Sequence, residues 1–225
     1  MNIAGFNINS FVDYPGHIAA VVFTGGCDLR CAYCHNKHIF NPERYFDEEE
    51  ILRLLFKHVN FLDGVVISGG EPTLQADLRE FILRLKDMGY KVKLDTNGMN
   101  PAMLSNIIDI TDYIAMDVKV NPYEYGRIME DGYVLNQSCA DNILESINII
   151  KARAKDYEFR TTVLPDFTVY EIISVAKVLQ GAKLYSLQSY RHFDGSNICG
   201  GVSGEFIQEA AKAAGEYVYT EIKGA

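Results

Sequence analysis

The chain has 225 residues, which is enough for one domain with a sizeable hydrophobic core. Hydrophobic residues make up 48% of it, but no apolar run approaches the length of about 18 residues that a membrane span needs. The formal net charge of −9 argues against a nucleic-acid partner, because proteins that bind a phosphate backbone present a basic face. The first residues lack the basic and apolar regions of a signal peptide, which predicts a cytoplasmic protein.

Short apolar strands alternate with helical segments along the chain. We expect strands at residues 18–24, 64–68, 91–96, 113–120, 157–163, 183–188 and 217–222, and helices at residues 47–60, 78–88, 101–110, 141–154, 168–179 and 204–214. Such alternation predicts an α/β fold, with a parallel sheet and the helices outside it. Right-handed crossovers then curl the sheet.

Eight β–α units normally take about 250 residues, so about six units in this length favour a partial, open (β/α)6 barrel. No shift in composition marks a linker. We therefore expect a single domain over residues 1–225, with a lead-in at 1–17 and a C-terminal extension from about residue 192.

Three cysteines directly follow the first of these predicted strands. Cys27, Cys31 and Cys34 form a C-x₃-C-x₂-C pattern in a chain with five cysteines and no export signal. In a reducing cytosol, clustered cysteines are better explained as metal ligands than as disulfides. Iron–sulfur clusters are held by cysteine thiolates, and a structural [4Fe–4S] cluster takes four of them. Three thiolates would leave one iron open for a substrate or a cofactor.

The alternative is a zinc site with three cysteines and His35 or His38 as the fourth ligand. His35 directly follows Cys34, and both could bind one ion only through a strained loop. Zinc-binding pairs also tend to recur in a sequence, whereas Cys139 and Cys199 stand alone. The spacing favours the iron–sulfur cluster.

A pair of glycines ends the second of these strands. Gly69 and Gly70 precede Glu71, and glycine lets the backbone approach a ligand closely. The alternative is an ordinary turn from strand to loop with a solvated glutamate.

Charged residues share one face of the next two strands. Lys93, Asp95 and Asn97 alternate along one strand, and Asp117 and Lys119 alternate along the next. An unpaired charge inside a barrel is costly, so two inward aspartates at neighbouring strand ends indicate a ligand site. A salt bridge from Lys119 to one of the aspartates is an equal alternative.

Arg160 lies in the middle of another predicted strand, which is an unusual place for an unpaired cation. It either orders a ligand or forms a buried ion pair with one of the acidic residues.

Together these motifs resemble the radical S-adenosylmethionine (SAM) superfamily. The cysteine loop is followed, in the expected order and at successive strand ends, by Gly69-Gly70-Glu71-Pro72, Asp95-Thr96-Asn97-Gly98 and Asp117-Val118-Lys119. The resemblance runs from Ser10 to about Arg191. It implies a [4Fe–4S] cluster on the three cysteines and reductive cleavage of SAM to methionine and a 5′-deoxyadenosyl radical.

Within the superfamily the chain resembles the activating enzymes of glycyl radical enzymes, and above all those of anaerobic ribonucleoside-triphosphate reductase. Residues 10–16 (SFVDYPG), 64–75 (GVVISGGEPTLQ), 93–98 (KLDTNG) and 159–163 (FRTTV) carry this finer match. It implies a glycyl radical enzyme as partner and a low-potential electron donor such as flavodoxin or ferredoxin. No further set of cysteines is present, so a single cluster is implied.

The same resemblance implies roles for individual residues. Gly69, Gly70 and Glu71 would meet the amino group of SAM, and Lys119 would face its carboxylate or ribose. The expected ligands of a monovalent cation beside the SAM carboxylate are Asp95, Thr96 and Asp117.

The other expected cofactor contacts are Tyr33, Asn97 and Arg160, with Gln188 and Arg191 as weaker candidates. Tyr33 either stacks near the adenine or packs under the cysteine loop. We assign no role to His35, His38, His58 and His192, and we expect Cys139 and Cys199 to be free thiols.

Two other functions remain open. The first is a radical SAM enzyme that acts on a small molecule or a peptide, as do the enzymes that form the 7-deazaguanine core. Their N-terminal signature differs from SFVDYPG. The second is a non-catalytic iron–sulfur or zinc protein, which the open coordination position and the GGE and DTNG motifs disfavour.

Overall fold

The structure, a computed structural model, describes residues 1–190 and 202–223. Arg191, His192 and Cys199, for which the sequence offers expectations, lie outside the described residues. No helix in the described part of the chain is both long enough and apolar enough to cross a membrane.

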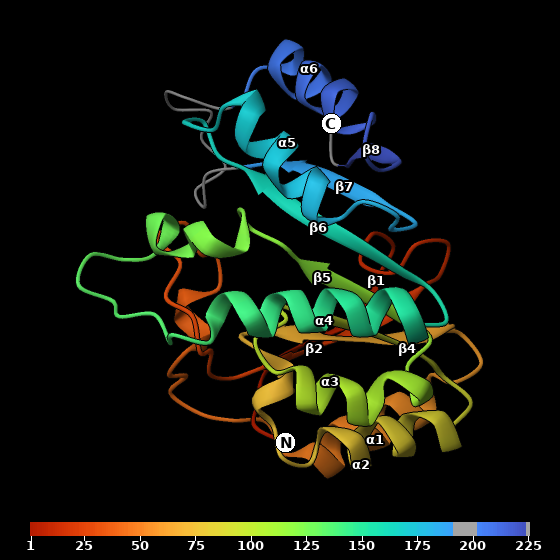
Figure 1. The fold of residues 1–225 in the computed structure, drawn as a ribbon. Helices are drawn as coiled ribbons and strands as arrows, with labels where there is room; N and C mark the ends of the chain where they lie inside the picture. Colours follow the sequence, from red (N-terminus) through yellow and green to blue (C-terminus); the bar gives the residue numbers. More distant parts are fainter. Residues whose placement is uncertain (191–201, 224–225) are drawn as a thin grey trace.

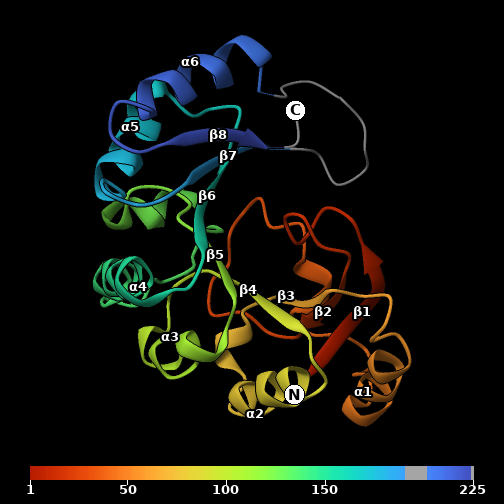
Figure 2. The ribbon, with the colours of Figure 1, turned by 90° about the vertical axis from the view of Figure 1, so that its right-hand side faces the viewer.

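Eight strands form one sheet in which the order in space equals the order in the chain. They are β1 (Ile3–Ser10), β2 (Ala19–Thr24), β3 (Gly64–Gly69), β4 (Lys91–Thr96), β5 (Tyr113–Asp117), β6 (Tyr157–Val163), β7 (Tyr185–Ser189) and β8 (Thr220–Lys223). β1 runs antiparallel to β2, and all later neighbours are parallel. Figure 2 shows the sheet as an open arc with β1 and β8 at its two edges.

Six helices cover the outer side of this arc (Figures 1 and 2). They are α1 (Glu48–Lys57), α2 (Leu78–Asp87), α3 (Pro101–Ile107), α4 (Cys139–Arg153), α5 (Val169–Val178) and α6 (Gly204–Ala214). Each helix follows one of the strands β2 to β7, so the chain contains the six predicted β–α units. The prediction of a partial α/β barrel with helices outside is confirmed.

Local sequence explains where several helices begin. The Asp47 side chain accepts a hydrogen bond from the backbone N–H of Glu50 at the start of α1, and Asn100 caps α3 in the same way. Thr168 and Glu171 cap each other's backbone at the start of α5, which is a capping box.

Residues 1–17, expected as a lead-in, include the strand β1. Here Phe6 and Ile8 alternate with Asn7 and Asn9, and this period of two residues is the signal for a strand. The strand expected at 113–120 ends earlier, at Asp117. The chain then turns into a short 3₁₀ helix, Pro122–Ile128, which proline starts.

The two faces of the sheet differ in character. Ile114, Met116 and Val118 belong to the large core under the helices, as the alternation predicts. The inner face carries a small apolar cluster near the amino ends of the strands, which includes Tyr14, Val66 and Ala115. Polar and charged side chains follow toward the carboxyl ends. This end of the arc is where the side chains with possible chemistry gather.

Candidate active site

A cavity of about 230 Å³ lies at the carboxyl ends of β2 to β6. Every residue that the sequence predicts as a cysteine ligand or as one of the main cofactor contacts lines it, namely Cys27, Cys31, Tyr33, Cys34, Gly69, Gly70, Glu71, Asp95, Thr96, Asn97, Asp117, Lys119 and Arg160. Gln188, a weaker candidate, is not among the lining residues. The fold thus brings segments far apart in the sequence around one space.

The three thiols of the cysteine loop lie on one side of this cavity. Gly26 starts the loop with a φ of 84°, a left-handed conformation that favours glycine. Further along, the backbone N–H of Ala32 donates to the carbonyl oxygen of Ile128, which fixes the loop against the 3₁₀ helix. Burial raises the pKa of the Cys27 thiol to about 12 and also raises the pKa of Cys31. A bound metal would be needed to hold these thiols as thiolates.

The donor set of three cysteines at the cavity is the kind that holds an iron–sulfur cluster. Among the described residues, no group of three or more His, Cys, Asp or Glu side chains converges on one point as a lone metal ion requires. A zinc ion draws four ligands to within about 2.0–2.3 Å, whereas a cluster of several irons spreads its thiolates.

Tyr33 brings a buried polar group to the lining of the cavity. Its hydroxyl is buried, and it has no hydrogen-bond partner among the described residues. Buried polar groups in proteins are almost always paired, so this hydroxyl is available to a ligand in the cavity. The residues present therefore fit a cluster together with a polar cofactor.

The two glycines after β3 allow the next wall to approach the cysteine loop. A Cβ atom on Gly70 would lie 1.8 Å from the carbonyl oxygen of Gly26, and one on Gly69 would lie 2.4 Å from the backbone nitrogen of Thr24. The backbone N–H of Glu71 donates to the Gly26 carbonyl at 2.9 Å. Only glycine permits this approach.

Glu71 is fully buried, so the alternative of a solvated glutamate is wrong. One carboxylate oxygen accepts hydrogen bonds from the hydroxyls of Thr73 and Thr96 at 2.6 and 2.7 Å. The other accepts from the backbone N–H of Asn97 at 2.7 Å. Burial raises the pKa of Glu71 to about 7, although these hydrogen bonds act in the opposite direction.

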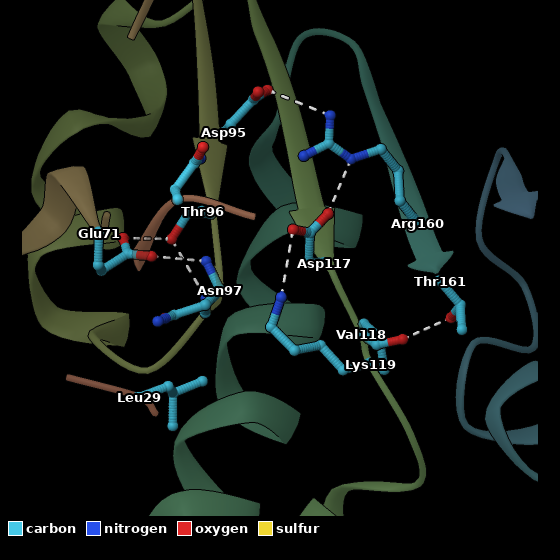
Figure 3. Close-up of polar contacts among 12 residues, drawn as sticks. Leu29, Glu71, Asp95, Thr96, Asn97, Asp117, Val118, Lys119, Arg160 and Thr161 are labelled. Atoms are coloured by element: carbon cyan, nitrogen blue, oxygen red, sulfur yellow. Dashed lines mark hydrogen bonds and ion pairs between the residues drawn. The ribbon is translucent and has the colours of Figure 1, made fainter. Parts of the chain in front are cut away.

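Five charged side chains form a chain of contacts across β4, β5 and β6, and Figure 3 shows four of them, namely Asp95, Asp117, Lys119 and Arg160. Lys93 Nζ lies 2.6 Å from Asp95 Oδ1, and Arg160 Nη1 lies 3.5 Å from the same oxygen. Arg160 Nε donates to Asp117 Oδ1 at 2.8 Å, and Lys119 Nζ lies 3.4 Å from Asp117 Oδ2. The salt bridge from Lys119 and the buried ion pairs of Arg160, which the sequence leaves open, are therefore present.

These pairs keep the carboxylates ionised. Burial alone raises the pKa of Asp95, but Arg160 and Lys93 outweigh it and hold the pKa below its ordinary value. Burial likewise opposes the ionised form of Asp117, and Arg160 and Lys119 again lower the pKa below its ordinary value. The site therefore carries fixed charges of both signs.

Sequence reasoning missed some residues of the cavity. Asn36 lines it and donates from Nδ2 to the Gly69 carbonyl at 3.2 Å, which ties the end of the cysteine loop to the glycine pair. Ser68 donates to Asp95 Oδ2 at 3.1 Å. Thr162 also lines the cavity, and its position two residues after Arg160 on β6 is the signal that could have found it.

Comparisons with known proteins agree with this site. Residues 21–179 match the model of the radical SAM superfamily. A Methanocaldococcus jannaschii protein, described as a candidate glycyl-radical enzyme activating enzyme, is 37% identical over 202 residues, which cover 85% of this chain and 81% of that protein. The pyruvate formate-lyase-activating enzyme of Clostridium pasteurianum is 36% identical over 129 residues, which cover 54% of this chain and 51% of that enzyme.

Solved structures show the same fold. The structure of TYW1 with a lysine-pyruvate adduct bound has a TM-score of 0.67 at 19% identity, and the match covers 89% of this chain and 74% of that chain. A [4Fe–4S] cluster and SAM are the cofactors of the superfamily whose model matches. The chain belongs to the radical SAM superfamily, in the branch of the glycyl-radical enzyme activating enzymes.

Proposed function

We propose that this chain binds its cluster through Cys27, Cys31 and Cys34 and activates anaerobic ribonucleoside-triphosphate reductase by generating a glycyl radical on it. The observation that carries the proposal is the meeting of the three thiols with the segments after β3, β4 and β5 around one cavity. When bound, the cluster and SAM supply the reductive cleavage that yields methionine and a 5′-deoxyadenosyl radical.

The chain's own residues bind and orient. Gly69 and Gly70 let the backbone line the cavity beside the cysteine loop, where an amino group of SAM would lie. Asp117 raises the pKa of Lys119 well above its ordinary value despite burial, so Lys119 stays protonated and offers a cation to the SAM carboxylate. Tyr33 offers its unpaired hydroxyl to the bound cofactor.

Glu71 acts through its neighbours in this proposal. Both of its oxygens are occupied by protein donors, so it fixes the loops after β3 and β4. Asn97 donates from Nδ2 to Asp28 Oδ1 at 2.8 Å and contributes to the cavity wall next to Cys27.

The choice of partner rests on the resemblance of residues 10–16, 64–75, 93–98 and 159–163. Relatives named pyruvate formate-lyase-activating enzymes make pyruvate formate-lyase the second candidate. A flavodoxin or ferredoxin would deliver the electron. The monovalent cation that the sequence predicts at Asp95, Thr96 and Asp117 is not part of this proposal.

The test uses anaerobically reconstituted protein with SAM, a reductant and each purified candidate partner. We expect slow formation of 5′-deoxyadenosine alone, faster formation with the reductase, and a persistent glycyl signal on the reductase in electron paramagnetic resonance. The Cys31→Ala variant is the control. A glycyl signal only on pyruvate formate-lyase would reassign the partner. Stimulation by a small metabolite without any glycyl signal would contradict the proposal.

A further inference from the structure

The guanidinium of Arg160 lies between the carboxylates of Asp95 and Asp117 (Figure 3). Asp117 is the register partner of Arg160 on the neighbouring strand, and Asp95 is the partner of Ala115, two residues before Asp117. The two carboxylates therefore share the inner face of the arc. Arg160 contacts both of them, at 3.5 and 2.8 Å.

This is the place that the sequence assigns to a monovalent cation, and the residues do not fit one. Thr96, the third expected ligand, is the last residue of β4, and its side chain contacts Glu71 rather than the two aspartates. Its hydroxyl donates to Glu71 at 2.7 Å and accepts from the backbone N–H of Gly98 at 3.2 Å. The hydroxyl of Thr96 is thus already occupied by protein partners, although Thr96 lines the same cavity as the two aspartates.

The group of five charged side chains already carries a net positive charge. Lys93, Lys119 and Arg160 bring three positive charges to the two negative charges of Asp95 and Asp117.

Glu158, the next acidic residue on the inner face of β6, does not change this balance. Its carboxylate contacts Lys223 on β8 and accepts a hydrogen bond from the hydroxyl of Ser186 at 2.7 Å. An added metal cation would leave the buried group of five with a net charge of about +2, which burial penalises.

We propose that Arg160 takes the place of the inorganic cation, so that this chain binds SAM without a monovalent metal ion. A guanidinium is always charged and presents several N–H donors in a fixed plane, which suits a bridge between two carboxylates. The surplus positive charge of the group then attracts the carboxylate of SAM. The inference rests on the proposed function only in taking SAM as the ligand.

The experiment measures SAM binding to the reconstituted protein by equilibrium dialysis. Sodium, potassium and tetramethylammonium chloride are compared at equal ionic strength. We expect the Kd of the wild type to agree within about twofold in the three salts, because ionic strength is constant and no ion is specifically bound. A Kd about tenfold weaker in tetramethylammonium would overturn the proposal.

Arg160→Ala supplies the second arm. Without the guanidinium the two carboxylates lose their bridge, and we expect SAM binding in tetramethylammonium to weaken about tenfold or more. Potassium, sodium or ethylguanidinium should restore part of it, because each provides a positive charge small enough for the vacated space. The assignment would be overturned if Arg160→Ala bound SAM in tetramethylammonium with the affinity of the wild type. It would also be overturned if the variant lost SAM binding and none of these ions restored it. Arg160→Lys tests whether charge alone suffices if Arg160→Ala does not fold.

Sodium-23 line widths give a readout that needs neither cluster nor SAM. Adding the wild-type protein to a sodium chloride solution should leave the width of the sodium-23 resonance unchanged, whereas adding Arg160→Ala should broaden it. The matched control is Arg153→Ala, which removes an exposed pair with Asp109 on the outer helices. Failure to bind SAM in any salt would refute the proposed function, and the sodium line width would still decide the inference.

Discussion

The carboxylate of Glu71 accepts a hydrogen bond of 2.7 Å from the backbone N–H of Asn97, and this contact joins the loops that follow β3 and β4. The backbone of Glu71 in turn donates to Gly26 at the start of the cysteine loop. One buried residue thus holds three walls of the cavity together. Its ionisation should therefore affect the stability of the whole site.

Glu71→Gln should change the pH dependence of stability. Burial raises the pKa of Glu71 to about 7 in the folded chain, so the folded state favours the protonated form. The stability that this residue contributes is present below its unfolded pKa and is lost as the pH rises through the folded pKa. Relative to Glu71→Gln, the wild type should lose about 3 kcal/mol of unfolding free energy between about pH 4.5 and about pH 8.

Urea denaturation of both proteins across this pH range, under anaerobic conditions, measures the difference. A difference that stays constant, or one that grows in favour of the wild type at high pH, would contradict the assigned pKa.

Gly70→Ala should separate two walls of the cavity. The new Cβ atom would lie 1.8 Å from the Gly26 carbonyl oxygen, so the loop after β3 must move away from the cysteine loop. We expect a loss of about 1–3 kcal/mol in stability and weaker SAM binding. Gly204→Ala is the control, because no atom lies within 4 Å of a Cβ atom there. Thermal unfolding and equilibrium dialysis check both variants, and equal behaviour of the two would refute the close approach.

Cys31→Ala should abolish cluster assembly, whereas Cys139→Ala should retain about four irons per chain. Both side chains are buried, at 6% and 4% exposure, so the two substitutions differ mainly in their relation to the cavity. Iron analysis and electron paramagnetic resonance of anaerobically purified protein provide the measurement. Full iron content in Cys31→Ala, or stoichiometric zinc in the wild type, would disprove the cluster assignment.

Asp117→Asn should weaken SAM binding about tenfold while iron content stays unchanged, because Arg160 and Lys119 lose the carboxylate that holds them. Asp109→Asn removes a carboxylate whose partner, Arg153, lies outside the arc and serves as the control. Equilibrium dialysis and iron analysis separate the two effects. Reduced stability with unchanged SAM affinity would assign Asp117 to the fold alone.

The sequence correctly predicts which side chains of one strand share the inner face of the sheet, because strand geometry alone determines this. A strand turns alternate side chains to opposite faces, so Lys93 and Asp95 must share a face, as must Asp117 and Lys119. Their ion pairs confirm this. The position of Arg160 could not be read in the same way, because its contact with Asp117 depends on the register between β5 and β6.

The burial of Glu71 and its hydrogen-bond donors could not be predicted from the sequence either. Its donors come from Thr73, Thr96 and Asn97; Thr96 ends β4 and Asn97 directly follows it, about 25 residues further along the chain. A turn such as Gly69-Gly70-Glu71 carries no local sign of burial. The sequence analysis does not predict strand β1, because its alternation of apolar and polar residues spans only a few positions around Phe6 and Ile8.

The order of the strands has a consequence for how such a chain can diversify. Within the part that the structure describes, the residues that line the cofactor cavity end at Thr162 on β6, and β7 and β8 are added at one edge of the sheet. A ribosome has therefore delivered every lining residue that the structure describes before it reaches α5. Tyr190, which follows β7, meets the ring of Tyr33 edge-on at a centroid distance of 6.3 Å, so the later segment can change without disturbing the described lining only where it keeps this contact.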